Sequence, residues 1–103
     1  MIICPPHDYM DPTMAYIVKD EMIKLGPPRI RAYYDGEIYR AIEGTHRLWA
    51  ADYLGYFPEI IEVSLHEIIA DHDFPDLPER CTVHDIIDYI GNTEPYDFSE
   101  RKK

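Results

Sequence analysis

The fold is decided by residues 29–54, which read RIRAYYDGEIYRAIEGTHRLWAADYL. The first six residues, 29–34, alternate in polarity as expected for a strand with one buried face. The pair Asp35-Gly36 follows and is typical of a type I′ hairpin turn, which predicts that residues 37–42 return as a second strand. Apolar residues then recur with helical spacing. The stretch therefore predicts a β-hairpin that leads into a helix over residues 45–54.

Segments with helix and strand signals flank this hairpin on both sides. Asp11 before Pro12 is a typical helix start, and Gly26 before two prolines is a typical stop. The expected flanking elements are a strand over 2–4, a helix over 12–25, a strand over 59–65, a short helix over 66–71 and a helix after Thr82 that ends at Gly91. We expect an α/β (α+β) fold with a small mixed sheet and flanking helices.

The chain has 103 residues, so we expect one small domain, over residues 1–91. Its core would span residues 3–65 and an acidic helical extension residues 66–91, while residues 92–103 are expected to form a flexible tail. No signal peptide and no long apolar run is visible, and the two cysteines do not suggest a disulfide framework. We therefore expect a cytoplasmic protein without a membrane segment.

Acidic residues are distributed unevenly in this chain of net charge −10. Residues 56–100 contain 12 acids and one base, whereas residues 1–55 contain 8 acids and 6 bases. This excess of acids argues against direct DNA binding through a broad basic surface. The acidic half fits either simple solubility or a surface that attracts a basic or DNA-binding protein.

The start of the predicted helix at residue 45 has the features of an anion site. Free backbone N–H groups and the positive end of the helix dipole meet there, and Gly44 lets a phosphate approach the backbone. Thr45 can cap the helix or donate to a phosphate oxygen, and Arg47 carries a guanidinium suited to phosphate. The alternative is that Thr45 is only a cap, Arg47 pairs with an acid and Gly44 only ends the strand.

The segment Glu43-Gly44-Thr45-His46-Arg47-Leu48-Trp49-Ala50-Ala51, followed by Leu54-Gly55, resembles the ParB/sulfiredoxin superfamily. The resemblance covers roughly residues 3–65. Upstream, Pro6-His7-Asp8 is similar to a Pro-His-Glu segment of the free-serine kinases of that superfamily. The resemblance implies a ParB-like nucleotide-binding fold.

This resemblance also implies site residues and a cofactor. Gly44, Thr45, His46 and Arg47 would hold the phosphates of ATP or CTP, with Mg²⁺ where phosphoryl transfer or hydrolysis occurs. Asp8 would act as a general base and Glu43 would lie close to the metal. The candidate catalytic residues are thus Asp8, Glu43 and His46, with Glu43 as the candidate Mg²⁺ ligand.

Departures from the superfamily limit what the resemblance implies. Sulfiredoxins have a cysteine at the position of Thr45, and a threonine cannot act as a thiolate, so sulfinic acid reduction is disfavoured. Neither the helix-turn-helix domain of ParB nor the extra domain of the serine kinases is visible. The sequence leaves open whether the chain is an enzyme. The competing function is a non-enzymatic acidic interaction module, such as an inhibitor or DNA mimic of the phage or mobile-element type, and a nuclease ranks third.

The other histidines give no metal motif. His66 and Glu67 begin a zinc-protease-like pattern, but alanine stands at position 70, where the second histidine would be needed. We therefore expect surface roles for His66, His72 and His84. Arg29 and Arg31 either add positive potential near the proposed anion site or protect a solvated sheet edge.

Overall fold

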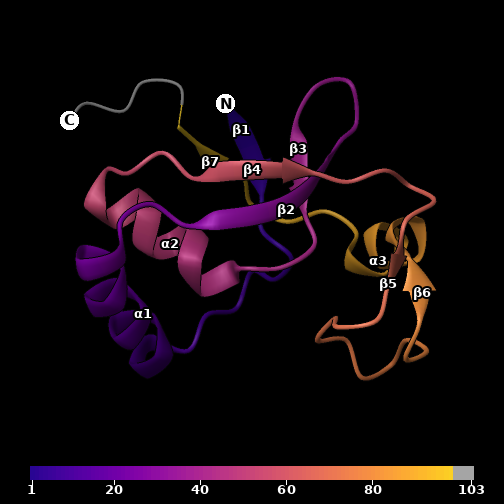
Figure 1. The fold of residues 1–103 in the computed structure, drawn as a ribbon, viewed down its shortest axis with the longest axis horizontal. Helices are drawn as coiled ribbons and strands as arrows, with labels where there is room; N and C mark the ends of the chain where they lie inside the picture. The colour runs from indigo at the N-terminus through magenta and orange to yellow at the C-terminus, as the bar shows by residue number, and fades with distance from the viewer. Residues whose placement is uncertain (99–103) are drawn as a thin grey trace.

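The computed structural model describes residues 1–98 and contains a mixed α/β domain (Figure 1). Its elements are β1 (Ile2–Cys4), α1 (Pro12–Leu25), β2 (Arg29–Tyr34), β3 (Tyr39–Ala41), α2 (Thr45–Leu54), β4 (Glu59–Glu62), β5 (Ile68–Ile69), β6 (Cys81–Thr82), α3 (Val83–Ile90) and β7 (Tyr96–Asp97). Both predicted long helices and the hairpin are present. The expected α/β class with a small mixed sheet and flanking helices is confirmed.

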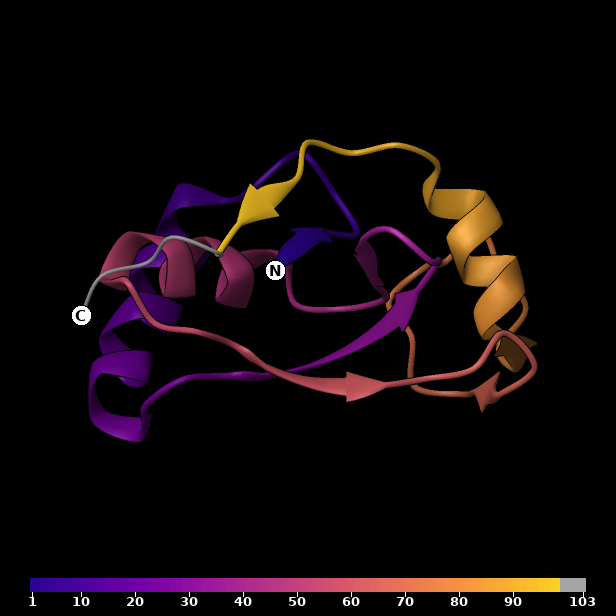
Figure 2. The same ribbon diagram turned by 90° about the horizontal axis from the view of Figure 1, so that it is seen from above.

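The main sheet has five strands in the order β4-β2-β3-β1-β7. Strands β2 and β3 form the antiparallel hairpin, while β1 pairs with β3 and β4 pairs with β2 in parallel. Helices α1 and α2 lie at one end of the long axis of the molecule, and α3 with the β5–β6 pair lies at the other (Figures 1 and 2). The segment that joins β3 to α2 therefore lies between the two ends.

Two hydrophobic clusters form the core. The larger one joins α1 and α2 to the sheet, with Ile3, Ile30, Leu48 and Phe98 all fully buried. The second cluster packs beneath α3 and consists of Ile42, Val63, Ile69, Phe74, Cys81, Val83 and Ile86. None of the helices within residues 1–98 is long and apolar enough to cross a membrane.

The hairpin turn differs from the type I′ geometry that we expected. Gly36 has a φ of 102°, but no other residue type among residues 1–98 has a positive φ, so Asp35 cannot take its place in such a turn. Instead, the Asp35 carboxylate accepts the backbone N–H groups of Glu37 and Ile38 at 2.9 and 3.0 Å. The side chain thus stabilises a longer turn, and the return strand is restricted to Tyr39–Ala41.

Strand 59–65 and helix 66–71 were also predicted incorrectly in part. Strand β4 is Glu59–Glu62, shorter than expected, and residues 68–69 form a strand that pairs with β6 instead of a helical turn. Ile68 is exposed and Ile69 is buried, which is the alternation of a strand. Pairing with a segment twelve or more residues away outweighs the local helical pattern.

The beginning of the expected flexible tail is ordered. Strand β7 pairs antiparallel with β1, and the Phe98 N–H donates to the Met1 carbonyl at 2.8 Å. Phe98 is fully buried in the larger cluster, and burial of this aromatic side chain explains why the segment is held. The expectation of a loose tail is wrong for residues 92–98, whereas residues 99–103 lie outside the described residues.

Candidate functional site

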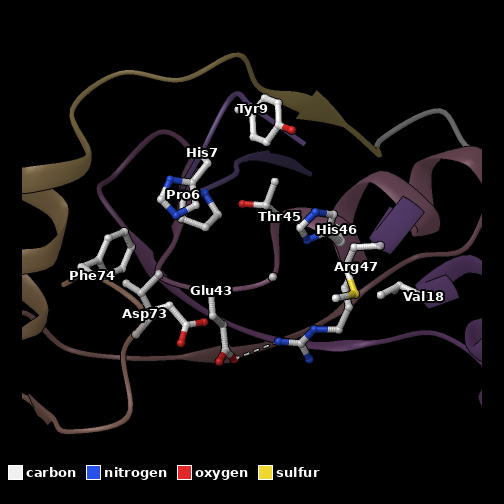
Figure 3. Close-up of a pocket in the computed structure, with 13 residues that line it drawn as sticks. Pro6, His7, Tyr9, Val18, Glu43, Thr45, His46, Arg47, Asp73 and Phe74 are labelled. Atoms are coloured by element: carbon white, nitrogen blue, oxygen red, sulfur yellow. Dashed lines mark ion pairs between the residues drawn. The ribbon is translucent and has the colours of Figure 1, made fainter. Parts of the chain in front are cut away.

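An open cleft of about 650 Å³ lies where the β1–α1 loop, the start of α2 and the β5–β6 segment meet (Figure 3). Its lining comprises Pro6, His7, Tyr9, Met14, Val18, Ile42, Glu43, Gly44, Thr45, His46, Arg47, Asp73 and Phe74. The whole predicted segment from Glu43 to Arg47 therefore faces one cavity. Asp8 does not belong to this lining.

Gly44 gives α2 an unusual start. It is the N-cap residue with φ 88° and ψ 34°, in the left-handed region, and no side chain among the described residues caps the helix. A Cβ atom at this position would lie 2.6 Å from Ile30 Cδ1, so both the backbone and the space favour glycine. The first N–H groups of α2 have no intrahelical partner, and groups of this kind can hydrogen-bond an anion.

Thr45 lines this cleft and carries a buried hydroxyl. It is the first residue of α2 rather than its cap, and its side chain is only 8% exposed. Within residues 1–98, Thr45 Oγ1 is the buried side-chain atom that has no hydrogen-bond partner. An orphaned buried hydroxyl costs about 1–3 kcal/mol, so a ligand atom that bonds to it would recover this cost.

Glu43 is part of an ion-pair cluster at the base of the cleft. Its Oε1 accepts from Arg31 Nη2 at 2.8 Å, and its Oε2 accepts from the Arg31 backbone N–H at 3.1 Å. Arg47 Nη2 lies 3.7 Å from the same carboxylate. Burial alone would raise the pKa of Glu43, but the hydrogen bonds and charge of Arg31 outweigh it and hold the pKa below its ordinary value. Glu43 is therefore a carboxylate that has already formed an ion pair.

Arg47 lies along the sheet side of the cleft rather than in front of the helix start. Its Nη1 donates to the Arg29 carbonyl oxygen at 2.8 Å, in addition to the longer ion pair with Glu43 (Figure 3). Its guanidinium also passes close to Gly44, with Nη2 3.4 Å from the position of a Cβ there. The pairing of Arg47 with an acid, which was the alternative to phosphate binding, is thus present, and the side chain also belongs to the cleft lining.

His46 and Asp8 have structural contacts of their own. His46 Nε2 accepts the backbone N–H of Asp11 at 3.1 Å, which ties the start of α1 to the start of α2. Asp8 is exposed, and its Oδ1 accepts the Glu94 N–H at 2.8 Å. Asp8 is therefore not brought together with Glu43 and His46.

An aromatic wall of the cleft was not among the predicted site residues. Phe74 is buried, and its ring centroid lies 5.3 Å from that of His7 and 5.7 Å from that of Tyr89. His7 and Phe74 are distant in sequence, and Phe74 lies in a proline-rich link without regular periodicity. No local pattern could have paired them, although His7 belongs to the Pro6-His7-Asp8 segment noted above.

Mg²⁺ does not fit the residue proposed to hold it. Both carboxylate oxygens of Glu43 already accept hydrogen bonds from Arg31. Among residues 1–98, no group of three or more His, Cys, Asp or Glu side chains is arranged to hold a metal ion. Mg²⁺ in proteins is usually bound through one or two free carboxylates together with substrate phosphates. Glu43 offers no such free carboxylate while Arg31 holds it.

Comparison of the chain with protein-family models, with curated proteins and with solved structures gives no match in any of the three.

Proposed function

We propose that the cleft binds a phosphate-bearing small molecule, a nucleotide such as ATP or CTP, with its phosphates at the start of α2. The observation that carries the proposal is the buried, unpartnered Oγ1 of Thr45 beside an uncapped helix N-terminus. A phosphate oxygen would accept hydrogen bonds from this hydroxyl and from the first N–H groups of α2. Such a ligand would provide the acceptor that the buried Thr45 hydroxyl lacks.

The opposite wall of the cleft supports a ligand with an aromatic body. His7 and Phe74 provide ring surfaces there, whereas Val18 of α1 lies on the other side of the cleft, beside Arg47 (Figure 3). A base or another flat ring can stack on a histidine that is itself supported by a phenylalanine. Hydrogen-bond donors gather around Thr45 and Arg47, and the Asp73 carboxylate lies beside Phe74 (Figure 3). The phosphates of a nucleotide would therefore bind at the start of α2 and its base against the rings of His7 and Phe74.

Arg47 would complete the phosphate site. Its Nη1 now donates to a neutral carbonyl oxygen, that of Arg29. A hydrogen bond between a guanidinium and an anionic oxygen is stronger than one to a carbonyl. A bound phosphate would therefore compete for the Arg47 guanidinium. The ParB/sulfiredoxin-like assignment is part of this proposal, and it rests on the same residues.

The proposal concerns binding, and no catalytic step is included. Asp8 does not line the cleft, and its Oδ1 accepts the Glu94 N–H, while the Glu43 carboxylate is held by Arg31. Neither carboxylate is placed as a free base for a hydroxyl group beside Thr45. Hydrolysis or phosphoryl transfer would need a rearrangement of these contacts.

The decisive experiment is calorimetric titration of wild type and Thr45→Val with ATP, CTP and pyrophosphate, with and without MgCl₂. Valine has the same shape as threonine but lacks the hydroxyl. We expect affinity to fall by roughly tenfold to 100-fold, since a hydrogen bond to a charged group contributes roughly 1.5–3 kcal/mol. Thr13→Val, an exposed change on α1, is the matched control. Absence of binding by wild type to all three compounds would refute the proposal.

The acidic surface is the second candidate function. Over residues 67–90, seven acids are exposed and Arg80 is the only Lys or Arg: Glu67, Asp71, Asp73, Asp76, Glu79, Asp85 and Asp88. A surface of this charge would attract a basic or DNA-binding protein. Double reversal of Glu79 and Asp88 to lysine would abolish such binding in a cross-linking assay, while nucleotide affinity should stay unchanged.

A further inference from the structure

Arg31 joins the two halves of the cleft. From β2, its guanidinium donates to Glu43 Oε1 at 2.8 Å and to the two carboxylate oxygens of Asp71 at 3.2 and 3.3 Å. Glu43 lies at the base of the cleft, before the start of α2. Asp71 lies in the segment between β5 and β6, a few residues before Asp73 and Phe74 of the far wall. The Arg31 side chain thus bonds to residues on both sides of the cleft.

The contacts of Arg31 are strong for a side chain near the surface. Its side chain is 23% exposed, and it contacts Asp71 with two nitrogen atoms. The hydrogen bond to Glu43 is the main cause of a raised pKa of Arg31, so the guanidinium stays charged. The same guanidinium lowers the pKa of Asp71 through a hydrogen bond and its charge. The bridge is therefore charged at both ends over the neutral pH range.

The far wall is also held within itself. The Phe74 N–H donates to His72 Nδ1 at 3.1 Å, and His72 Nε2 lies 2.7 Å from the Pro78 carbonyl oxygen. Phe74 itself packs against Tyr89 of α3. These local contacts hold residues 72–74 together. The bond between Arg31 and Asp71 therefore sets the position of this whole segment relative to α2.

We propose that Arg31 is a positioning residue that sets the distance between the start of α2 and the Phe74 wall, and so favours ligands long enough to contact both. The inference rests on the proposed function. A small anion needs only the helix start, whereas a nucleotide also needs the wall. Arg31 therefore affects the preference for a nucleotide over a small anion more than it affects phosphate binding itself.

Asp71→Ala separates this role from simple electrostatics. Asp71 is negatively charged, so its removal should strengthen anion binding if charge alone mattered. If the Arg31–Asp71 contact positions the Phe74 wall, its loss should instead lower ATP affinity about fivefold to tenfold. This is the usual size of an energetic coupling between two sites. Pyrophosphate affinity should not fall. Glu67→Ala is the matched control, because it removes the same charge from an exposed site and leaves the Arg31 contacts intact.

Amide hydrogen exchange of the ligand-free protein provides a measurement that does not depend on binding. We expect faster exchange of the backbone amides of residues 72–74 in Asp71→Ala and in Arg31→Met. Arg40→Met is the control, since it breaks a 2.9 Å ion pair with Asp35 that is as shielded as that of Arg31 with Glu43, with side chains 25% and 24% exposed against 23% and 25%.

The outcomes distinguish the two proposals. Unchanged exchange in both test variants, or equal ATP affinity in Asp71→Ala and Glu67→Ala, overturns the role of Arg31. If wild type binds neither ATP nor pyrophosphate, the proposed function fails, and hydrogen exchange alone then decides whether Arg31 positions the wall.

Discussion

Helices α2 and α3 begin in opposite ways, although each has a threonine at its start. At α3, Thr82 is the N-cap and forms a capping box: its Oγ1 accepts the Asp85 N–H at 3.1 Å, while Asp85 Oδ2 accepts the Thr82 N–H at 3.2 Å. At α2, the cap is Gly44, and Thr45 stands one position further on with an unpartnered hydroxyl. The difference is one position in the chain.

Because of this shift, side chains of the chain itself bond to the N–H groups at the start of α3, whereas no side-chain cap within the described part of the chain bonds to those at the start of α2. A capping box satisfies two orphan N–H groups within the chain and leaves little for a ligand. The start of α2 has no such bonds among residues 1–98 and also opens onto the cleft. We infer that α3 is optimised for stability and that α2 retains an energetic cost that a ligand would remove.

The largest expected effect comes from Gly44→Ala. Alanine would adopt a left-handed backbone at φ 88° and would bring its Cβ to 2.6 Å from Ile30 Cδ1 in the larger core cluster. We expect a loss of about 2–4 kcal/mol in the free energy of unfolding, from backbone strain together with overpacking. Urea unfolding measures it.

Gly36→Ala is the control for this prediction. Gly36 also has a positive φ, of 102°, but a Cβ there would meet nothing within 4 Å. The Gly36→Ala variant should therefore lose only about 1–2 kcal/mol in the free energy of unfolding, from backbone strain alone. Equal losses for the two alanine variants would show that the close approach of Ile30 does not constrain the α2 start.

The comparison of the two threonines predicts changes of opposite sign. Thr82→Val removes the cap and should destabilise the protein by about 1 kcal/mol. Thr45→Val removes a buried, unsatisfied hydroxyl and should stabilise the ligand-free protein by a comparable amount, about 1 kcal/mol. Thermal unfolding without ligand measures both, and destabilisation by Thr45→Val would show that its hydroxyl is satisfied in solution.

Local signals predicted the left half of the molecule in Figure 1 well. Asp11 caps α1 by accepting the Thr13 N–H, and Gly26 and Gly55 end the two long helices, as their sequence context indicates. Apolar spacing placed Leu48 in the core. These features depend on neighbours within a few residues, so a single sequence contains the required information.

Features that depend on distant partners could not be predicted in this way. The strand at Ile68 needs β6, and Phe98 enters the core because β1 offers an open edge. In the candidate site, the motif at Gly44 predicted one side of the cleft, but the wall of Phe74 and its tether from Arg31 to Asp71 join segments about 40 residues apart. Charge pairing of this kind has no periodicity in the sequence.

The smallest expected effect is the acid dependence of stability. Arg31 lowers the pKa of both Glu43 and Asp71, so their contribution is present above the ordinary carboxyl pKa of about 4 and is lost as pH falls through the lowered values. We expect the urea midpoint of wild type to fall between about pH 5 and pH 3. In Arg31→Met, burial dominates at Glu43 and pushes its pKa upward, so the midpoint should fall less.

Arg40→Met again separates a specific effect from loss of any arginine. The pKa of Asp35 is lowered first by the backbone N–H groups of Ile38 and Glu37, and Arg40 contributes less. This variant should therefore keep nearly the same acid dependence as wild type. If Arg31→Met and Arg40→Met showed the same pH profile, the ion pairs before the start of α2 would have no larger effect on acid stability than the equally shielded pair at the hairpin.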